Sequence, residues 1–180
     1  MKNKAIFFDR DGVVNYRIVG EYIKTIDEFH FIPDFFPLFS YIKEREFIAI
    51  LITNQQGIGR GVMNEEQLNK IHSYMQKILI KKTGSGFDDI FYCPELSSAN
   101  SFRRKPNPGM LLEAMEKWQI DPNKSWMVGD RVSDFLAGKN AGIKTVIANC
   151  LVEPNEIAAD FVGYNLIDVL EFFKGNEALL

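Results

Sequence analysis

The sequence is poor in cysteine and histidine, with two of each among its 180 residues. Cys93 and Cys150 are isolated, which excludes the disulfide framework of a small secreted protein. Reduced thiols are expected instead, with Cys150 in the core or at the end of a strand. His30 and His72 are also isolated. His72 stands among lysine and serine residues of a predicted helix, which favours a surface position over a catalytic role.

Long apolar runs are missing as well. No stretch reaches the roughly 18 apolar residues that a membrane-spanning helix needs. The first apolar run is too short for a signal peptide and ends in acidic residues. The chain also has no excess of positive charge. Its 21 basic and 24 acidic side chains leave a net charge of -3, which argues against broad binding to a nucleic-acid backbone. We expect a cytoplasmic protein, monomeric or weakly self-associating, that binds neither membranes nor nucleic acid.

The chain does have an ordinary globular composition, 46% hydrophobic and 25% charged, and its length fits one domain spanning residues 1–180. Short apolar runs predict buried strands, and the stretches between them have helical periodicity. The predicted strands are 4–8, 47–52, 89–92, 125–128 and 145–148, and the predicted helices are 34–45, 64–82, 108–118, 133–140 and 166–174. This alternation predicts an α/β fold, a doubly wound parallel sheet in a three-layer sandwich. Segment 15–32 is predicted to be a loop or small hairpin.

Polar clusters follow four of the predicted strands. They are Asp9-Arg10-Asp11-Gly12, Thr53-Asn54-Gln55, Arg103-Arg104-Lys105, and Gly129-Asp130 with Asp134. Ligands of open α/β sheets bind outside the carboxyl ends of the strands, where these clusters fall. The sequence therefore predicts an active site at this edge.

The acidic residues predict a magnesium site. Asp9 and Asp11 are two residues apart at the end of the first strand, where their mutual repulsion is relieved by a hard divalent cation. Asp130 supplies a further oxygen from the fourth strand, and Asp134 completes the predicted set. Asp134 could act through water or by orienting Asp130, and capping the following helix is the alternative reading.

The same residues predict phosphoryl transfer. Asp9 is the candidate nucleophile and Asp11 the candidate acid and base, while Lys105 stabilises the charge that develops during transfer. Thr53 and Asn54 are placed to hold phosphoryl oxygens. The further candidates for binding the substrate or its phosphate are Asn15, Gln55, Arg60 and Arg104, of which Arg60 and Arg104 could instead be solvated surface residues.

These four motifs, in this order, resemble those of the haloacid dehalogenase (HAD) superfamily. The sequences around Asp9, Thr53 and Lys105 are most similar to the capless branch that contains D,D-heptose 1,7-bisphosphate phosphatases and histidinol-phosphate phosphatases. Two departures stand out. Val13 replaces the usual threonine, and loop 93–104 keeps one cysteine of the three cysteines and one histidine that commonly hold a structural zinc in this branch. One thiol cannot hold zinc, so we predict none.

The resemblance implies a magnesium-dependent phosphomonoesterase of carbohydrate metabolism that forms an aspartyl-phosphate. It acts on a small phosphorylated metabolite, with a heptose 1,7-bisphosphate as the leading substrate and histidinol phosphate or another small ester as the alternative. A signalling receiver domain phosphorylated on aspartate is an alternative of another class. It is disfavoured because Cys93-Pro94-Glu95, with no aspartate, follows the third predicted strand. A catalytically inactive homologue is disfavoured by the complete motif set.

Overall fold

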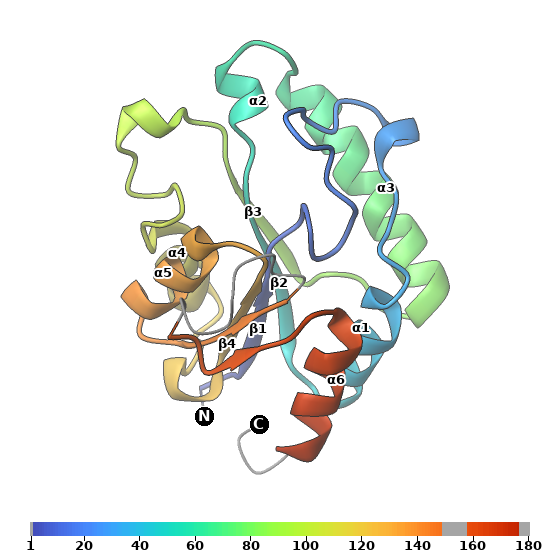
Figure 1. Ribbon diagram of the computed structural model, residues 1–180, viewed down its shortest axis with the longest axis vertical. Helices are drawn as coiled ribbons and strands as arrows, with labels where there is room; N and C mark the ends of the chain where they lie inside the picture. Colours follow the sequence, from blue (N-terminus) through green and yellow to red (C-terminus); the bar gives the residue numbers. More distant parts are fainter. Residues whose placement is uncertain (1, 149–157, 177–180) are drawn as a thin grey trace.

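The centre of the protein is a parallel sheet with the strand order β3-β2-β1-β4-β5-β6 (Figure 1). This computed structural model describes residues 2–148 and 158–176, so Cys150 lies outside the described residues. The strands are β1 (Ala5–Phe8), β2 (Ile48–Asn54), β3 (Asp89–Cys93), β4 (Trp126–Gly129), β5 (Lys144–Ile147) and β6 (Phe161–Val162). The order reverses between β1 and β4, and a doubly wound sheet binds its ligands at such a point.

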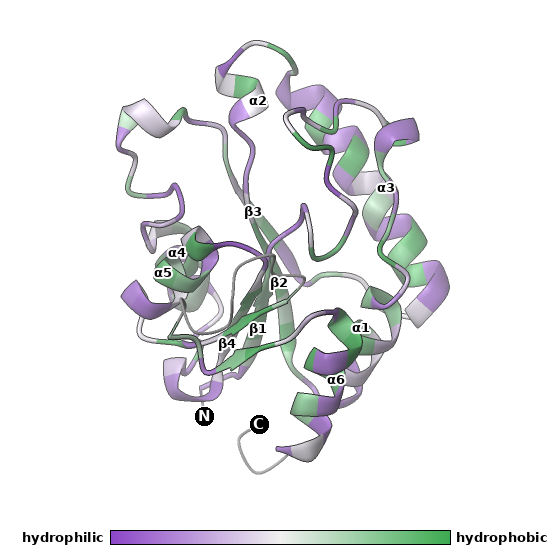
Figure 2. Ribbon diagram, viewed as in Figure 1, coloured by the Kyte–Doolittle hydropathy of each residue, from purple (hydrophilic) through white to green (hydrophobic). Residues whose placement is uncertain are grey.

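Alternate strand residues pack on opposite faces of the sheet. Ile6 and Phe8 join the core beneath α1 (Phe35–Glu44), α3 (Glu65–Thr83) and α6 (Leu166–Gly175). Ala5 and Phe7 join the core beneath α4 (Gly109–Lys117) and α5 (Val132–Asn140). Burial on both sides explains why every residue of β1 is apolar, and the middle of the sheet is mostly green in Figure 2. The predicted doubly wound, three-layer α/β sandwich is confirmed.

Local signals fix the helix ends. Asn64 accepts a hydrogen bond from the Gln67 amide at the start of α3, and Gly84 ends this helix with φ 78°. All five predicted strands and all five predicted helices are present, each within about two residues of its predicted ends. The one-turn helix α2 (Gln56–Gly59) and the two-residue strand β6 were not predicted, because elements this short carry no periodic pattern. No helix among residues 2–148 and 158–176 is long and apolar enough to cross a membrane.

Segment 15–32 leaves the sheet after β1 and returns beside its own start. The Tyr16 amide donates to the His30 carbonyl at 2.9 Å, and the Ile32 amide donates to the Val14 carbonyl at 3.0 Å. A short 3-10 helix, Ile26–Glu28, turns the chain between them. The prediction of a loop or small hairpin is confirmed, and buried Phe29 anchors the segment in the core.

Candidate active site

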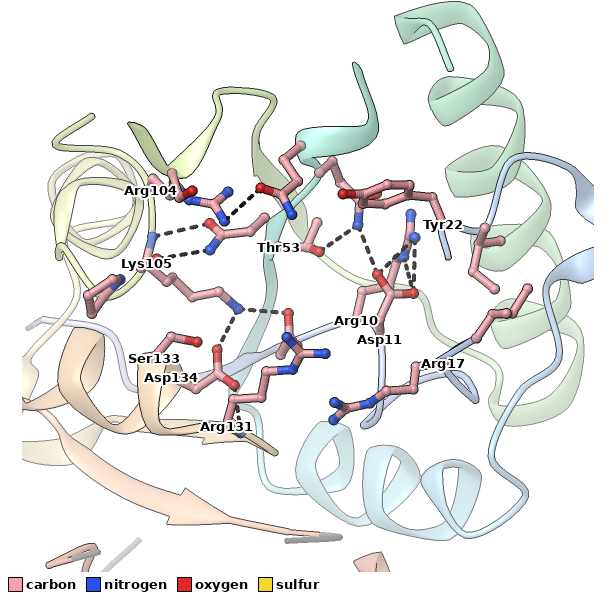
Figure 3. Close-up of a pocket in the computed structure, with 18 of the residues that line it drawn as sticks. Arg10, Asp11, Arg17, Tyr22, Thr53, Arg104, Lys105, Arg131, Ser133 and Asp134 are labelled. Carbon is pink, nitrogen blue, oxygen red and sulfur yellow. Dashed lines mark hydrogen bonds and ion pairs between the residues drawn. The ribbon is translucent and has the colours of Figure 1, made fainter. Parts of the chain in front are cut away.

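A cavity of about 390 Å³ lies at the carboxyl ends of the strands (Figure 3). Its walls come from every polar cluster that follows a strand and from segment 15–32. The residues from the sequence-predicted set that line it are Asp9, Asp11, Thr53, Asn54, Gln55, Arg104, Lys105 and Asp134. Segments far apart in the chain thus converge at one edge of the sheet, as the strand-end pattern predicts.

Lys105 is the buried centre of the site. Its ammonium nitrogen lies 2.7 Å from Asp9 Oδ1, 2.6 Å from Asp134 Oδ1 and 2.8 Å from the Ile52 carbonyl. These contacts use all three donors of the ammonium group. Burial alone would lower the pKa of Lys105, but the carboxylates of Asp134 and Asp9 raise it above its ordinary value. The lysine therefore stays charged.

Asp9 is buried at the end of β1, with 8% of its surface exposed. Burial raises the pKa of its carboxyl to about 6, against the opposing effect of Lys105. Asn54 fixes the lysine from β2: its amide nitrogen donates to the Lys105 carbonyl at 2.9 Å, and its amide oxygen accepts from the Lys105 amide at 3.1 Å. The Asn54 amide is thus bonded to backbone, where a phosphoryl contact was expected.

Asp9, Asp130 and Asp134 form an acidic group whose ligand atoms lie within 4.8 Å of one another. Both Asp134 oxygens are engaged, one by Lys105 and the other by the amides of Asp130 and Arg131. Neither oxygen of buried Asp130 accepts a hydrogen bond from the described residues, although Arg17 forms an ion pair with it. Asp130 Oδ1 accepts no hydrogen bond and is not the oxygen that pairs with Arg17, and the Asp130 carboxylate lies beside Asp9, so this group fits a hard cation such as Mg²⁺.

Glycine allows the turn after β1 to approach Asp130. Gly12 has a φ of 103°, a conformation that other residues rarely adopt. A β-carbon at this position would collide with the Asp130 carboxylate. The first and fourth motifs therefore meet at a backbone position that only glycine fits.

Asp11 stands apart from the acidic group, although it was predicted as a metal ligand. Its carboxylate accepts hydrogen bonds from Arg10 at 3.0 Å, Asn15 at 2.9 Å and Gln55 at 3.0 Å. Burial opposes ionisation, but the Arg10 charge and these hydrogen bonds hold the pKa of Asp11 below its ordinary value. Gln55 also donates to the Thr53 hydroxyl at 2.8 Å, which links Asp11 to β2.

Three predicted substrate contacts differ in position. Arg104 lines the cavity and donates to the Gln56 side chain at 3.2 Å and to the Glu95 carbonyl at 3.1 Å. Asn15 is fully buried behind Asp11. Arg60 is exposed, does not line the cavity, and lies over the Tyr22 ring. The structure thus brings Arg104 to the cavity and leaves the other two outside it.

Three arginines were missed by the sequence reading. Arg10 is fully buried against Asp11, and Arg17 and Arg131 line the cavity. Arg17 belongs to segment 15–32, whose irregular backbone gives no periodic signal. Arg131 directly follows Asp130, so its position after the fourth strand was a usable signal.

His72 was predicted at the surface, and that prediction is wrong. The imidazole is 6% exposed, its Nε2 lies 3.4 Å from Arg10 Nη1, and its ring meets Tyr92 edge-on. Burial, followed by the Arg10 charge, lowers the pKa of His72 to about 3. The signal was the helix period: Leu68, His72, Met75 and Leu79 share the buried face of α3.

Comparisons with known proteins place the chain among phosphatases. The family model described as HAD-hydrolase-like matches residues 102–153. The chain is 37% identical over 182 residues to D-glycero-beta-D-manno-heptose-1,7-bisphosphate 7-phosphatase of Pasteurella multocida, covering 96% of this chain and 97% of the relative. It is 39% identical over 176 residues to D-glycero-alpha-D-manno-heptose-1,7-bisphosphate 7-phosphatase of Campylobacter jejuni, and this match covers 97% of this chain and 98% of the relative.

A solved structure is similar over nearly the same extent. The D,D-heptose 1,7-bisphosphate phosphatase of B. bronchiseptica, complexed with magnesium and phosphate, superposes with a TM-score of 0.85 and 27% identity. The match covers 96% of this chain and 98% of that one. These relatives share one named chemistry, the removal of a phosphate from a heptose bisphosphate.

Proposed function

Because the chain belongs to the HAD-like phosphatase family that includes these heptose-1,7-bisphosphate 7-phosphatases, we propose that it removes the 7-phosphate of a D-glycero-D-manno-heptose 1,7-bisphosphate. One observation supports this activity most directly. Lys105 joins Asp9 to Asp134 inside a polar cavity, with Asp130 beside them and Asp11 at the wall. A nucleophilic carboxylate, a fixed cation and a second carboxyl are the groups that such a transfer requires.

Asp9 is the nucleophile in this mechanism. One of its oxygens forms a bond to phosphorus while the bond from phosphorus to the sugar oxygen breaks. Asp11 gives its proton to the departing sugar oxygen, and it then takes a proton from the water that attacks the aspartyl-phosphate. The water oxygen bonds to phosphorus while the bond from phosphorus to Asp9 breaks, which releases phosphate and restores the Asp9 carboxylate. A phosphate dianion next to Asp11 opposes its ionised form and so favours the protonation that the first step needs.

Cations around the cavity match the charge of a bisphosphate. Lys105 is buried beside Asp9, and Arg17, Arg104 and Arg131 also line the cavity. A planar guanidinium donates to two oxygens of one phosphate, which suits it to holding the phosphate that is not transferred. Thr53 and Ser133 add hydroxyl groups to the same walls.

Magnesium is the cofactor that fits the acidic group. Asp9 and Asp130 would hold it, because Asp134 is occupied by Lys105 and by two backbone amides. When bound, the cation would screen the charges of the phosphate and of Asp9. In this assignment Asp134 acts indirectly, because it fixes Lys105 and the start of α5.

A phosphate-release assay over a panel of esters tests the function. The panel contains both anomers of the heptose bisphosphate, because relatives of both types match this chain, together with histidinol phosphate and other sugar phosphates. We expect kcat/KM for one heptose anomer to exceed that for histidinol phosphate by at least about 100-fold, because histidinol phosphate has no second phosphate to pair with the arginines that line the cavity. Chelating magnesium should lower the rate by at least about 100-fold.

The panel can also contradict the proposal. Higher activity on histidinol phosphate would favour the alternative substrate. No release from any ester in the presence of magnesium would remove the phosphatase assignment for this site.

The loop that follows β3 is proposed to need no zinc. Cys93 is buried at the end of the strand, 3.8 Å from a Glu95 oxygen. Protein contacts hold the loop: Arg104 donates to the Glu95 carbonyl, Asn107 donates to the Ser101 carbonyl at 2.8 Å, and the backbone of Gly109 donates to Phe102.

A chelator that removes zinc but spares magnesium should therefore leave thermal stability unchanged. We expect a shift in melting temperature below about 1 °C, whereas loss of a structural zinc removes folding energy outright. Elemental analysis of the purified protein gives an independent reading. A large loss of stability, or about one zinc per chain, would show that a metal site exists after all.

A further inference from the structure

Arg10 holds the carboxylate of Asp11 through its guanidinium group. Its Nε and Nη2 atoms donate to Asp11 at 3.0 to 3.2 Å, with Nη2 reaching both carboxylate oxygens. Asn15 and Gln55 each add one hydrogen bond. The carboxylate is thereby fixed in one orientation, and the guanidinium of Arg10 supplies most of the hydrogen bonds that fix it.

His72 contacts the remaining edge of that guanidinium. Arg10 is fully buried, and its Nη1 atom lies 3.4 Å from His72 Nε2, a long hydrogen bond. A neutral imidazole with its proton on Nδ1 offers Nε2 as an acceptor. Burial and the neighbouring guanidinium lower the pKa of His72 to about 3, which keeps the imidazole neutral at physiological pH.

We propose that His72 is a positioning residue for the reaction: it holds Arg10 from α3, and Arg10 in turn holds the carboxyl of Asp11 toward the substrate. The residue touches no substrate, because it does not line the cavity. The inference rests on the proposed function, in which Asp11 protonates the departing oxygen. It links a helix on one face of the sheet to the acid and base at the sheet edge.

The role of Asp11 gives His72 a specific signature. A sugar oxygen is a poor leaving group and needs the proton of Asp11, whereas the oxygen of p-nitrophenyl phosphate leaves as a stable anion and needs little help. Loss of positioning should therefore slow the sugar phosphate far more than the aryl phosphate. A general loss of packing would slow both substrates alike.

The test compares kcat/KM of three variants on both substrates, with the best sugar phosphate of the panel as the first. His72→Leu removes the acceptor and should lower kcat/KM about 10-fold for the sugar phosphate and about twofold for the aryl phosphate. His72→Gln can place an acceptor near the same point and should stay within about twofold on both. Met75→Leu, one turn along the same buried face, is the packing control and should match the parent.

Several results would overturn the inference. Equal losses on both substrates, or an unchanged His72→Leu, would remove the positioning role. If His72→Leu does not fold, His72→Asn replaces it, since its shorter side chain falls short of Arg10. In an Arg10→Lys background the His72 substitution should add no further loss, and additive losses would contradict action through Arg10. A parent enzyme inactive on every ester would instead refute the proposed function.

Discussion

Replacing Asp9 with asparagine is expected to lower kcat by at least about 10⁴-fold, because the amide cannot form the bond to phosphorus. Asparagine has nearly the same shape, and Lys105 keeps its contact with Asp134, so the fold should persist. Phosphate release measured with magnesium present gives the rate, and circular dichroism checks the fold. Asp27→Asn, at an exposed position, is the matched control and should keep full activity. Near-normal turnover by Asp9→Asn would show that the nucleophile is another residue.

The same substitution should change the pH dependence of stability. The pKa of Asp9 rises from its ordinary value of 3.8 to about 6 in the folded protein, mainly because the carboxyl is buried. A raised carboxyl pKa stabilises the folded state below the unfolded pKa, and that stabilisation is lost as the pH rises through about 6. Asparagine does not ionise, so Asp9→Asn should gain stability relative to the parent between pH 4 and 7.

Thermal melts of the metal-free proteins across this range measure the difference. A chelator is needed because a bound cation would itself favour the ionised carboxylate. A parent protein that gains stability over Asp9→Asn as the pH rises would contradict the raised pKa.

The site residues that could be predicted from the sequence are those that directly follow the buried strands. Buried strands are short and continuously apolar, so the first polar residue after each one marks the carboxyl edge of the sheet. Asp9, Thr53 and Asp130 could be placed in this way without knowing any contact. The order of the strands then brought Asp9 and Thr53 to one cavity and placed Asp130 beside Asp9.

The residues that were missed act through side-chain contacts between elements. Side chains alternate between the two faces of a strand, and Arg10 is an even number of residues after Ile6 and Phe8, which pack on the α3 side of the sheet. The strand pattern therefore indicated that Arg10 lies toward α3. His72 has the spacing of the buried face of α3. Each signal was present separately. Their meeting depends on how α3 packs on the sheet, which no local pattern specifies.

The contacts of Asn54 and the position of Arg60 differ from those predicted for a related reason. Asn54 ends β2 and Arg60 follows it, and a polar residue at this edge is equally able to face the cavity or to bond the neighbouring loop. The Asn54 side-chain amide forms hydrogen bonds with the backbone of Lys105, and Arg60 lies after the single turn of α2, outside the cavity. Position after a strand therefore predicts proximity to the site better than it predicts a contact.

Replacing Lys105 with methionine is expected to damage both folding and catalysis. Without the ammonium, the carboxylates of Asp9 and Asp134 remain buried and lose their shared partner. Breaking a buried pair in this way costs about 3–5 kcal/mol of unfolding free energy. Loss of the fixed cation should also lower kcat by roughly 10³-fold. Denaturant unfolding and phosphate release measure the two effects. Lys117→Met, at an exposed ion pair with Asp89, should cost less than about 1 kcal/mol.

A second substitution separates the two effects. Asp134→Asn in the Lys105→Met background removes one of the two buried carboxylates that lost their partner, so it should restore much of the lost stability. It should not restore the rate, because no cation returns to the position beside Asp9. Recovery of stability without activity would assign Lys105 both roles. It would hold two carboxylates in the folded protein and stabilise the negative charge that develops while the phosphoryl group is transferred to Asp9. Recovery of both would mean that the lysine serves folding alone and that the charge in the transition state is stabilised by other groups.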